Sequence, residues 1–200
     1  MNEKKLVQQA QNGDFSAFTE LINAHKGRIY SLALKMTNNP QDSEDIVQDT
    51  FLKAIDKIDQ FRGEAAFGSW LYSIALNEIR GHFGKQKRED LKPVEEYLPA
   101  QGAHSEGGSN SAHVFDWGDP HRILESRELR EVIDEAINEL PIKYREAFVL
   151  RYFEELPVKE VAELIKESVA ATKSRILRAR LAVRDKLNSV FEDRYGRKMH

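Results

Sequence analysis

Six basic side chains gather in the stretch ATKSRILRARLAVRDKL, residues 171–187, against the single acid Asp185. Lysine and arginine neutralise phosphate groups and donate hydrogen bonds to the edges of bases, so this composition is typical of a nucleic-acid contact. The whole chain is nevertheless slightly acidic, with 33 Asp and Glu residues against 30 Lys and Arg residues. The positive charge is therefore a local feature that needs its own explanation.

The spacing of apolar residues predicts an amphipathic helix over 169–187. This helix follows a short helical segment, VKEVAELI, and a tight turn, KES, in which Ser168 can cap the next helix. Such a pair is typical of a helix-turn-helix, whose second helix enters the major groove of DNA. The buried face would hold Val169, Thr172, Ile176, Ala179, Val183 and Leu187. The opposite face would hold Ser174, Arg175 and Arg178, flanked by Lys173 and Arg180. A solvated basic face without a partner is the alternative interpretation.

The other charges are also unevenly distributed along the chain. Residues 42–59 hold six acids against two lysines, and residues 80–88 hold four basic residues and no acid. Residues 89–121 hold seven acids against one lysine. This alternation predicts separate surfaces for separate partners.

Aromatic and basic residues alternate over residues 61–87, a pattern that suits single-stranded nucleic acid. Exposed rings stack on unpaired bases while basic side chains follow the backbone. The rings are Phe61, Phe67, Trp70, Tyr72 and Phe83, and the basic residues are Arg62, Arg80, Lys85 and Lys87. Helical periodicity offers the alternative that several of these rings belong to a core.

Helices must position these residues, because helical periodicity dominates and no stretch alternates like a strand. The apolar positions from Phe15 to Leu34 predict two helices, with Asp14 capping the first. A further helix is predicted from Asp42 or Ser43 as N-cap. Its buried stripe would be Val47, Phe51, Ala54 and Ile58, with Asp45, Gln48, Asp49, Leu52 and Asp56 on the other side. The segment FRGEAAFGSW reads as a loop, after which Ser69 can start the next helix.

Residues 86–119 change character, being rich in Gly, Pro, Ser and acids. A stretch of that length without periodicity predicts a linker between two domains. Structure is expected to resume with Asp119 as a cap and Pro120 at the first helical position. Pro141, Pro157 and Ser168 then separate about four helices. We therefore expect an all-α protein of two small helical domains, 1–88 and 120–200, joined by a flexible acidic linker, 89–119.

Several function classes receive no support from the sequence. There is no cysteine, so disulfides and thiolate metal sites are excluded. The six histidines are scattered, and His104, His113 and His121 alone are not expected to bind a metal. No HExxH, phosphate loop or nucleophile motif is present, so neither catalysis nor a cofactor is expected. Without a secretory signal or an apolar run of bilayer length, we expect a cytoplasmic protein with no direct membrane insertion.

Four segments together resemble the extracytoplasmic-function (ECF) sigma factors, the two-domain bacterial transcription initiation factors of the sigma-70 family. LPVKEVAELIKESVAATKSRILRARLAVRDKL resembles their C-terminal DNA-binding domain, and ELPIKYREAFVLRYFEEL the helices that lead into it. DSEDIVQDTFLKAI resembles their polymerase-binding helix, and FRGEAAFGSWLYSIALNEIRGHF their promoter-melting segment. The resemblance covers residues 5–88 and 119–190, with an unlike linker between them.

The chain departs from the family pattern at a few positions. Lys166 stands where family turns usually have Gly, so a non-glycine residue is expected to adopt a positive φ. Pro157 replaces a small polar cap, and Gly81 stands where a polar residue is common. Ala171 and Thr172 replace the usual Thr-Val. These differences affect which promoter sequence the protein is expected to recognise, and they do not affect its expected general role.

The resemblance implies three binding surfaces. The surface for core RNA polymerase would comprise Asp45, Gln48, Asp49, Phe51, Leu52 and Asp56. The surface for the minus-ten element, with a flipped base held by the loop 61–68, would comprise Phe61, Arg62, Gly63, Phe67, Trp70, Asn77, Arg80 and Lys85. The surface for the minus-thirty-five element would comprise Ser168, Lys173, Ser174, Arg175, Arg178, Arg180 and Arg184. The acidic linker would follow the RNA-exit path of polymerase, with HVFDW, residues 113–117, as an anchor or a chance apolar segment.

The expected function is promoter-specific transcription initiation with core RNA polymerase and promoter DNA, and without a small-molecule substrate. The resemblance also implies control by an anti-sigma factor, often bound to the membrane, in a stress or envelope response. A helix-turn-helix regulator whose N-terminal domain senses an effector is the main alternative. A helical hydrolase with paired carboxylates such as Glu44 and Asp45 is the third. Association with core polymerase distinguishes the first from the others.

Overall fold

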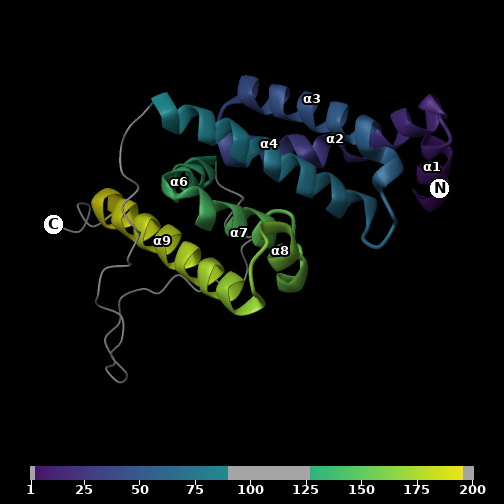
Figure 1. Ribbon diagram of the computed structural model, residues 1–200. Coiled ribbons are helices and arrows are strands. Elements are labelled where there is room, and N and C mark those ends of the chain that lie inside the picture. Colours follow the sequence, from purple (N-terminus) through teal and green to yellow (C-terminus); the bar gives the residue numbers. More distant parts are fainter. Residues whose placement is uncertain (1–2, 90–126, 196–200) are drawn as a thin grey trace.

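All regular structure in the described part of the chain is helical (Figure 1). The computed structural model describes residues 3–89 and 127–195, and the side chains of 3–84 and 130–190. The first range holds α1 (Glu3–Gln11), α2 (Phe15–Thr37), α3 (Pro40–Lys57), the 3-10 turn η1 (Ile58–Gln60) and α4 (Phe67–Glu89). The second holds α6 (Arg127–Glu139), α7 (Ile142–Tyr152), α8 (Val158–Ile165) and α9 (Val169–Tyr195). Most of the predicted linker, the segment 113–117, the three linker histidines and the predicted cap at Asp119 and Pro120 lie outside the described residues.

The helix α2 is a single helix, so the prediction of two helices from Phe15 to Leu34 is wrong. Its predicted cap is confirmed, because Asp14 Oδ1 accepts hydrogen bonds from the backbone N–H groups of Ser16 at 2.9 Å and Ala17 at 3.2 Å. The Ser16 hydroxyl also donates to this carboxylate, and these hydrogen bonds lower the pKa of Asp14. Gly27 does not interrupt the helix, since the apolar stripe continues beyond it and is buried.

The helix α3 begins earlier than predicted, at Pro40, and its N-cap is Asn39 rather than Asp42 or Ser43. Asn39 Oδ1 accepts from the N–H groups of Gln41 and Asp42, and Pro40 occupies the first turn, where its missing N–H costs nothing. The Ser43 side chain is buried and donates to the Asn39 carbonyl at 2.6 Å. The predicted buried stripe of this helix is confirmed: Val47, Phe51, Ala54 and Ile58 are all buried.

The second group of helices follows the sequence prediction closely. Pro141 and Pro157 stand at the N-caps of α7 and α8, and Ser168 directly precedes α9. The described part of this region thus has the four helices expected. The apolar face of α6 is buried at Val132, Ile133 and Ala136, and Leu140, directly after the helix, is also buried.

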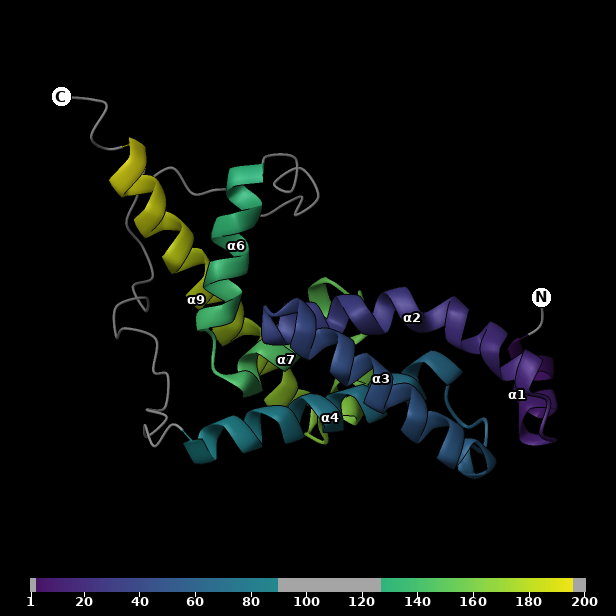
Figure 2. The ribbon, with the colours of Figure 1, turned by 90° about the horizontal axis from the view of Figure 1, so that it is seen from above.

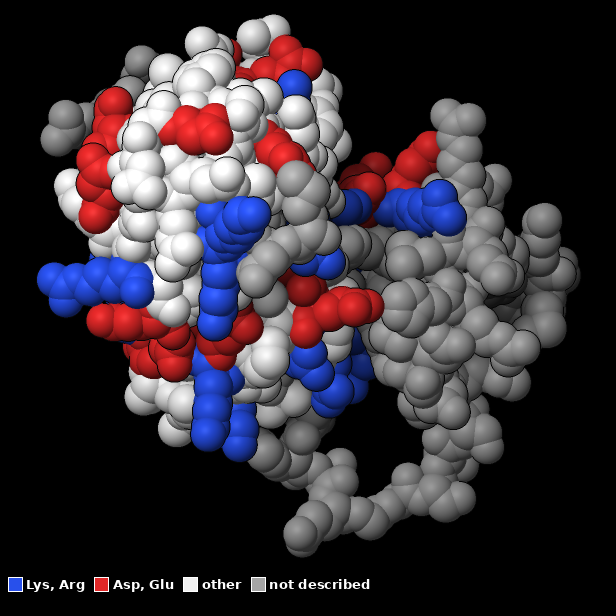
Figure 3. All heavy atoms as spheres, turned by 90° about the vertical axis from the view of Figure 1, so that its right-hand side faces the viewer, with Lys and Arg blue, Asp and Glu red and all other residues white. Residues whose placement is uncertain are grey.

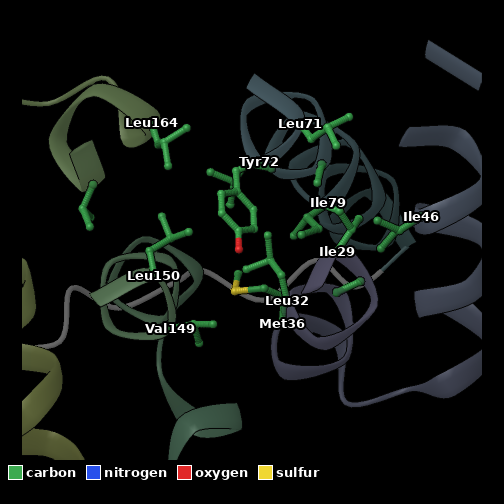
Figure 4. Packing of buried hydrophobic residues seen from close by; sticks show 14 of the residues in the cluster. Ile29, Leu32, Met36, Ile46, Leu71, Tyr72, Ile79, Val149, Leu150 and Leu164 are labelled. Carbon is green, nitrogen blue, oxygen red and sulfur yellow. The ribbon is translucent and has the colours of Figure 1, made fainter. Parts of the chain in front are cut away.

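The two groups of helices share one hydrophobic core. In Figure 2, α4 runs along the side of the N-terminal bundle that faces α7 and α8, and α2 also contacts α6 and α7. Figure 4 shows Tyr72 of α4 between Leu150 of α7 and the α2 residues Leu32 and Met36. Apolar burial is the main favourable contribution to such a contact. The two groups are therefore packed together, with α2 and α4 of the first group against α6, α7 and α8 of the second.

Candidate nucleic-acid interface

The helix-turn-helix predicted from the sequence is present as α8, a three-residue turn and α9. Lys166 ends α8 with a φ of 58°, so the expected non-glycine residue in the left-handed region is confirmed. Its backbone N–H donates to the carbonyls of Ala162 and Glu163. Ser168 Oγ accepts from the Ala171 N–H at 3.1 Å and so caps α9 as predicted.

The helix α9 buries an apolar face and exposes a basic one. The buried residues are Thr172, Ile176, Ala179, Val183 and Leu187. The prediction for Val169 is wrong, because its side chain is 39% exposed in the first turn, where the helix projects beyond the core. Lys173, Ser174, Arg178 and Arg180 are exposed, as is Ser168.

Three arginines of this helix have partners within the chain. Arg175 forms an ion pair with Glu167, and Arg184 pairs with the neighbouring Asp185 at 2.9 Å. Arg178 donates from Nη1 to the Tyr144 hydroxyl at 3.3 Å while remaining exposed. The side chains of Lys173 and Arg180 are exposed beside them. The basic face is therefore accessible, and part of it is held in place by neighbouring groups.

A second exposed surface lies on α3 and combines acidic and apolar side chains. Asp45, Gln48, Asp49, Leu52 and Asp56 are all exposed, as their spacing predicts. Phe51 is not part of this surface, because its ring is buried in the core. Ile55, which the sequence analysis did not single out, is 36% exposed beside Leu52 at 54%. The spacing of three residues between Leu52 and Ile55 is the signal that could have identified it.

The loop between η1 and α4, residues 61–66, stands on a cluster of aromatic rings. The Phe67 ring is packed 5.5 Å from those of His25 and Phe61 and 5.4 Å from that of Trp70. Its side chain is 2% exposed, so the prediction that Phe67 contacts DNA directly is wrong. Phe67 instead supports the half-buried rings of Phe61 and Trp70 from below. Gly63 allows the loop to turn with a φ of 72°.

The other predicted residues of this segment differ in exposure. Arg62, Gly63 and Asn77 are exposed, and Arg80 is partly buried. Tyr72 is buried, and the partly buried Phe83 packs against the core with the Arg145 guanidinium 5.8 Å above its ring. Tyr72 and Phe83 therefore follow the alternative interpretation of core residues. The side chain of Lys85 lies outside the described residues.

The loop has a cavity on each of its two sides. One, of about 340 Å³, is lined by Trp70, Ser73 and Asn77 of α4 and by Glu160 and Glu163 of α8, among others. The other, of about 290 Å³, lies between the loop and α1. Figure 3 shows that the face of the molecule nearest α1 carries acidic and basic side chains side by side. This end of the molecule therefore carries no charge of a single sign in that view.

Comparison with protein families gives two matches along the chain. The model described as Sigma-70 region 2 matches residues 21–89, and the one described as Sigma-70, region 4 matches residues 130–183. The ECF RNA polymerase sigma factor SigW of Bacillus subtilis is 36% identical over 188 residues, which cover 94% of this chain and 97% of SigW. This chain belongs to the ECF sigma factors. The ECF RNA polymerase sigma-E factor of Haemophilus influenzae is 32% identical, over 94% of this chain and 96% of its own.

Solved structures show the same fold. CnrH, in complex with the cytosolic domain of CnrY, aligns with a TM-score of 0.66 and 24% identity over 94% of this chain and 97% of its own. The sigma factor RpoE of Bartonella quintana, in complex with the anti-sigma factor NepR, aligns with a TM-score of 0.62 and 23% identity, over 86% of this chain and 96% of its own. Sigma factors are transcription initiation factors that bind core RNA polymerase and promoter DNA, and they are not enzymes. The family is thus favoured over the effector-controlled regulator and the hydrolase.

In this sigma factor the region 2 helix α4 makes polar contacts with the region 4 helices. Arg80 forms a bidentate ion pair with Glu146, with distances of 2.8 Å from Nε to Oε1 and 2.9 Å from Nη2 to Oε2. Tyr72 and Ser69 donate hydrogen bonds to Glu154 and Glu160. The hydrogen bond to Glu146 raises the pKa of Arg80. One predicted DNA contact, Arg80, is therefore occupied by the other half of the protein.

Sequence reasoning missed the residue that joins the two halves most deeply, Arg145. Its Nη1 donates to the Met36 carbonyl at the end of α2 at 2.5 Å, and its Nη2 donates to the carbonyls of Asn138 and Leu140. Burial lowers the pKa of Arg145 to about 10. The available signal was the position of Arg145 among the apolar residues of α7, which indicates a buried charge. A buried charge needs partners, and only the tertiary structure supplies them.

Two further observations bear on the function classes considered. Within residues 3–89 and 127–195, no helix is long and apolar enough to span a bilayer. The described residues also contain no cluster of three or more His, Asp or Glu side chains that could hold a metal ion.

Proposed function

We propose that this sigma factor uses three surfaces, one for each of its expected partners. The basic face of α9 would contact the minus-thirty-five element, the loop 61–66 with α4 the minus-ten element, and α3 core RNA polymerase. The domains would divide as predicted, at 1–88 and 120–200. The observation that carries this proposal is the geometry of α9, which buries its apolar stripe and leaves Lys173, Ser174, Arg178 and Arg180 exposed behind a capped N-terminus.

The exposed face of α3 suits a basic helical surface on core polymerase. Leu52 and Ile55 provide an apolar centre, and Asp45, Asp49 and Asp56 surround it with negative charge. Interfaces commonly combine a desolvated apolar centre with a polar rim, and complementary charge speeds association and fixes orientation. Phe51 would contribute by supporting the helix from the core.

Replacing Leu52 with Ala tests the polymerase surface. Truncating an apolar side chain at the centre of an interface typically costs about 1–2 kcal/mol, which corresponds to roughly 5- to 30-fold weaker binding of core polymerase. Phe15→Ala is the control for loss of an exposed apolar side chain, because Phe15 is 69% exposed and belongs to α2 rather than to α3. Equal affinities for the wild type and Leu52→Ala in a pull-down titration would exclude α3 as the polymerase surface.

The packed arrangement implies that promoter recognition requires a rearrangement. Arg80 is less available to the minus-ten strand because Glu146 accepts from its Nε and Nη2, and Glu160 and Glu163 add negative charge to the cavity beside the loop. We infer that the described arrangement is a closed state and that α4 separates from α7 and α8 on promoter DNA. Binding of polymerase by region 2 would supply part of the free energy for this opening.

Run-off transcription with purified core polymerase and a pool of genomic fragments tests the function as a whole. Sequencing the transcripts identifies a promoter set with shared minus-ten and minus-thirty-five sequences, which the proposal requires. Strong sequence-specific DNA binding by the chain alone, with no association with core polymerase, would instead favour the effector-controlled regulator. The same experiment provides a defined promoter for every variant below.

We further infer that this sigma factor acts in the cytoplasm in a stress or envelope response. An anti-sigma protein at the membrane would hold it inactive when that stress is absent. The solved complexes of CnrH with CnrY and of RpoE with NepR support this inference by analogy of fold. Co-purification from native cells with and without envelope stress tests it. Association with polymerase alone, at a level that stress does not change, would count against it.

A further inference from the structure

The N-terminal helix α1 lies before the segment that matches the region 2 family model, which begins at residue 21. It packs on α2 and on η1, and buries Val7 and Ala10. Its C-terminal residue is Gln11, which therefore stands close to the start of the loop 61–66. This position brings a chain segment outside the matched region against a loop inside it.

The side chain of Gln11 spans the two ends of the backbone segment that leads into the loop. Its Nε2 donates to the Ile58 carbonyl at 2.9 Å and to the Phe61 carbonyl at 2.8 Å. A carboxamide nitrogen carries two hydrogens, so both of its donors are used. The Phe61 N–H also donates to the Ile58 carbonyl at 3.1 Å, so a backbone hydrogen bond closes the turn between these two residues. The Phe61 backbone is therefore held by two hydrogen bonds, and a third ties Gln11 to the Ile58 carbonyl at the other end of the turn.

The rest of the loop has little support of this kind. Residues 62–65 donate no backbone hydrogen bond to the backbone of another described residue. The ring of Phe61 packs 5.2 Å from that of Trp70, and both residues line the 340 Å³ cavity that also contains Asn77. Fixing the Phe61 backbone therefore fixes one wall of this cavity. A binding site that is ordered in advance does not lose the free energy of ordering its loop when the ligand arrives.

We propose that Gln11 is a positioning residue for promoter melting, because its carboxamide holds the first residue of the loop beside Trp70 and Asn77. These residues form the part of the cavity wall that stays with α4 when α8 moves away, and there an unpaired base can be accepted. This proposal rests on the proposed function of the loop 61–66 in minus-ten recognition. Gln11 acts through the Phe61 backbone and does not touch the base. The helix α1 thereby helps to order the loop that captures the melted strand.

Two substitutions at Gln11 separate the hydrogen bonds from the shape of the side chain. Gln11→Glu keeps the shape but places a charged acceptor against two carbonyl oxygens, and it should lower open-complex formation about tenfold. Gln11→Lys supplies donors again at similar length and should restore at least half of the wild-type level. Gln8→Glu makes the same chemical change on an exposed side chain of the same helix and should have no effect.

The experiment uses the full chain with core polymerase on the promoter found by run-off transcription. An abasic site is placed at each non-template position of the minus-ten element in turn. The wild type should lose activity most at the position whose base enters the cavity. On that abasic template the deficit of Gln11→Glu should shrink from about tenfold to less than twofold, because there is no base left to capture.

The outcomes distinguish the function of the loop 61–66 from the role of Gln11. A wild type that is indifferent to every abasic site would overturn the function proposed for the loop and the role of Gln11 with it. A wild type that is sensitive at one site, combined with a Gln11→Glu deficit that is equally large on intact and abasic templates, would overturn the positioning role alone. An unchanged thermal midpoint for Gln11→Glu and Gln11→Lys shows that neither result comes from loss of fold.

Discussion

Arg80 and Glu146, 66 residues apart in the chain, form the ion pair that joins α4 to α7. The carboxylate is almost fully buried, with 5% of its side chain exposed, whereas 31% of the Arg80 side chain is exposed. Such a pair owes much of its strength to two parallel hydrogen bonds with good geometry. Because Arg80 is also an expected contact of the minus-ten strand, the two roles compete for one guanidinium.

Glu146→Gln should weaken the closed state without removing the shape of the side chain. Gln keeps one acceptor for Arg80 and loses the charge, so the expected cost to the interdomain contact is about 1–2 kcal/mol. The free protein should then bind a single-stranded minus-ten oligonucleotide roughly 5- to 30-fold more tightly, measured by fluorescence anisotropy.

Glu78→Gln is the matched control for this prediction. Glu78 pairs with Lys53 at 2.5 Å, but both residues belong to the N-terminal bundle, so its loss leaves the contact between α4 and α7 in place. An equal gain in oligonucleotide affinity for both variants would mean that general loss of negative charge, and not opening, explains the effect.

The buried carboxyl of Glu154 predicts a pH dependence of stability. Burial raises the pKa of Glu154 from its ordinary value of 4.5, and the Tyr72 hydroxyl and Arg28 oppose this shift without cancelling it. The folded state therefore keeps a proton in a pH range in which the unfolded chain has released it. The stabilising contribution is complete below about pH 4.5 and is lost as the pH rises through the folded pKa.

Urea unfolding of the wild type and Glu154→Gln from pH 4.5 to pH 7 tests this dependence, since other titrating groups cancel in the difference. The glutamine still accepts from Tyr72 and has no charge to desolvate, so its relative stability should increase across this range. A difference that stays constant with pH would show that Glu154 does not titrate in this range. A relative loss with rising pH would reverse the sign argued here.

Local chemistry explains which features could be predicted from the sequence. The caps at Asp14 and Ser168, the left-handed Lys166 and the stripe of α3 each depend on residues within a turn or two of one another. The wrong start of α3 arose from competition between neighbouring caps, in which Asn39 followed by Pro40 prevails. The single helix α2 contains Gly27, and burial of the apolar stripe on both sides of this residue outweighs its propensity cost of about 1 kcal/mol.

The features that could not be predicted depend on contacts between distant segments. Phe67 and Trp70 are both aromatic and three residues apart, yet packing against rings that include His25 buries the first, while the second lines the cavity. The partners of Arg80 and Gln11 lie 66 and between 47 and 50 residues away, where periodicity gives no signal. The exposed faces of α3 and α9 were thus predictable from spacing, whereas the loop 61–66 and α4 were predictable as segments and not as sets of exposed side chains.

Lys166→Gly should stabilise the helix-turn-helix. A left-handed conformation costs a residue with a Cβ about 1–2 kcal/mol, and glycine avoids this cost while losing more chain entropy on folding. The expected net gain in unfolding free energy is about 1 kcal/mol, measured by urea unfolding. Lys166→Ala keeps the strain and removes only the long side chain, so it should show no gain. Equal gains for Gly and Ala would attribute the effect to the lysine side chain instead.

Arg178 and Arg184 should differ in what they contribute to promoter binding, although both lie on α9. Arg178 is exposed near the N-terminal half of the helix, the part that enters the groove, whereas Arg184 lies nearly two turns later beside Asp185. With the holoenzyme, Arg178→Ala should cost about 1–3 kcal/mol on the promoter and relax the preference at one base pair. Arg184→Ala should weaken binding to promoter and scrambled DNA alike and reduce the salt slope by about one unit. If Arg178→Ala instead loses equal affinity for both DNAs, α9 holds phosphates at this position and does not read the sequence.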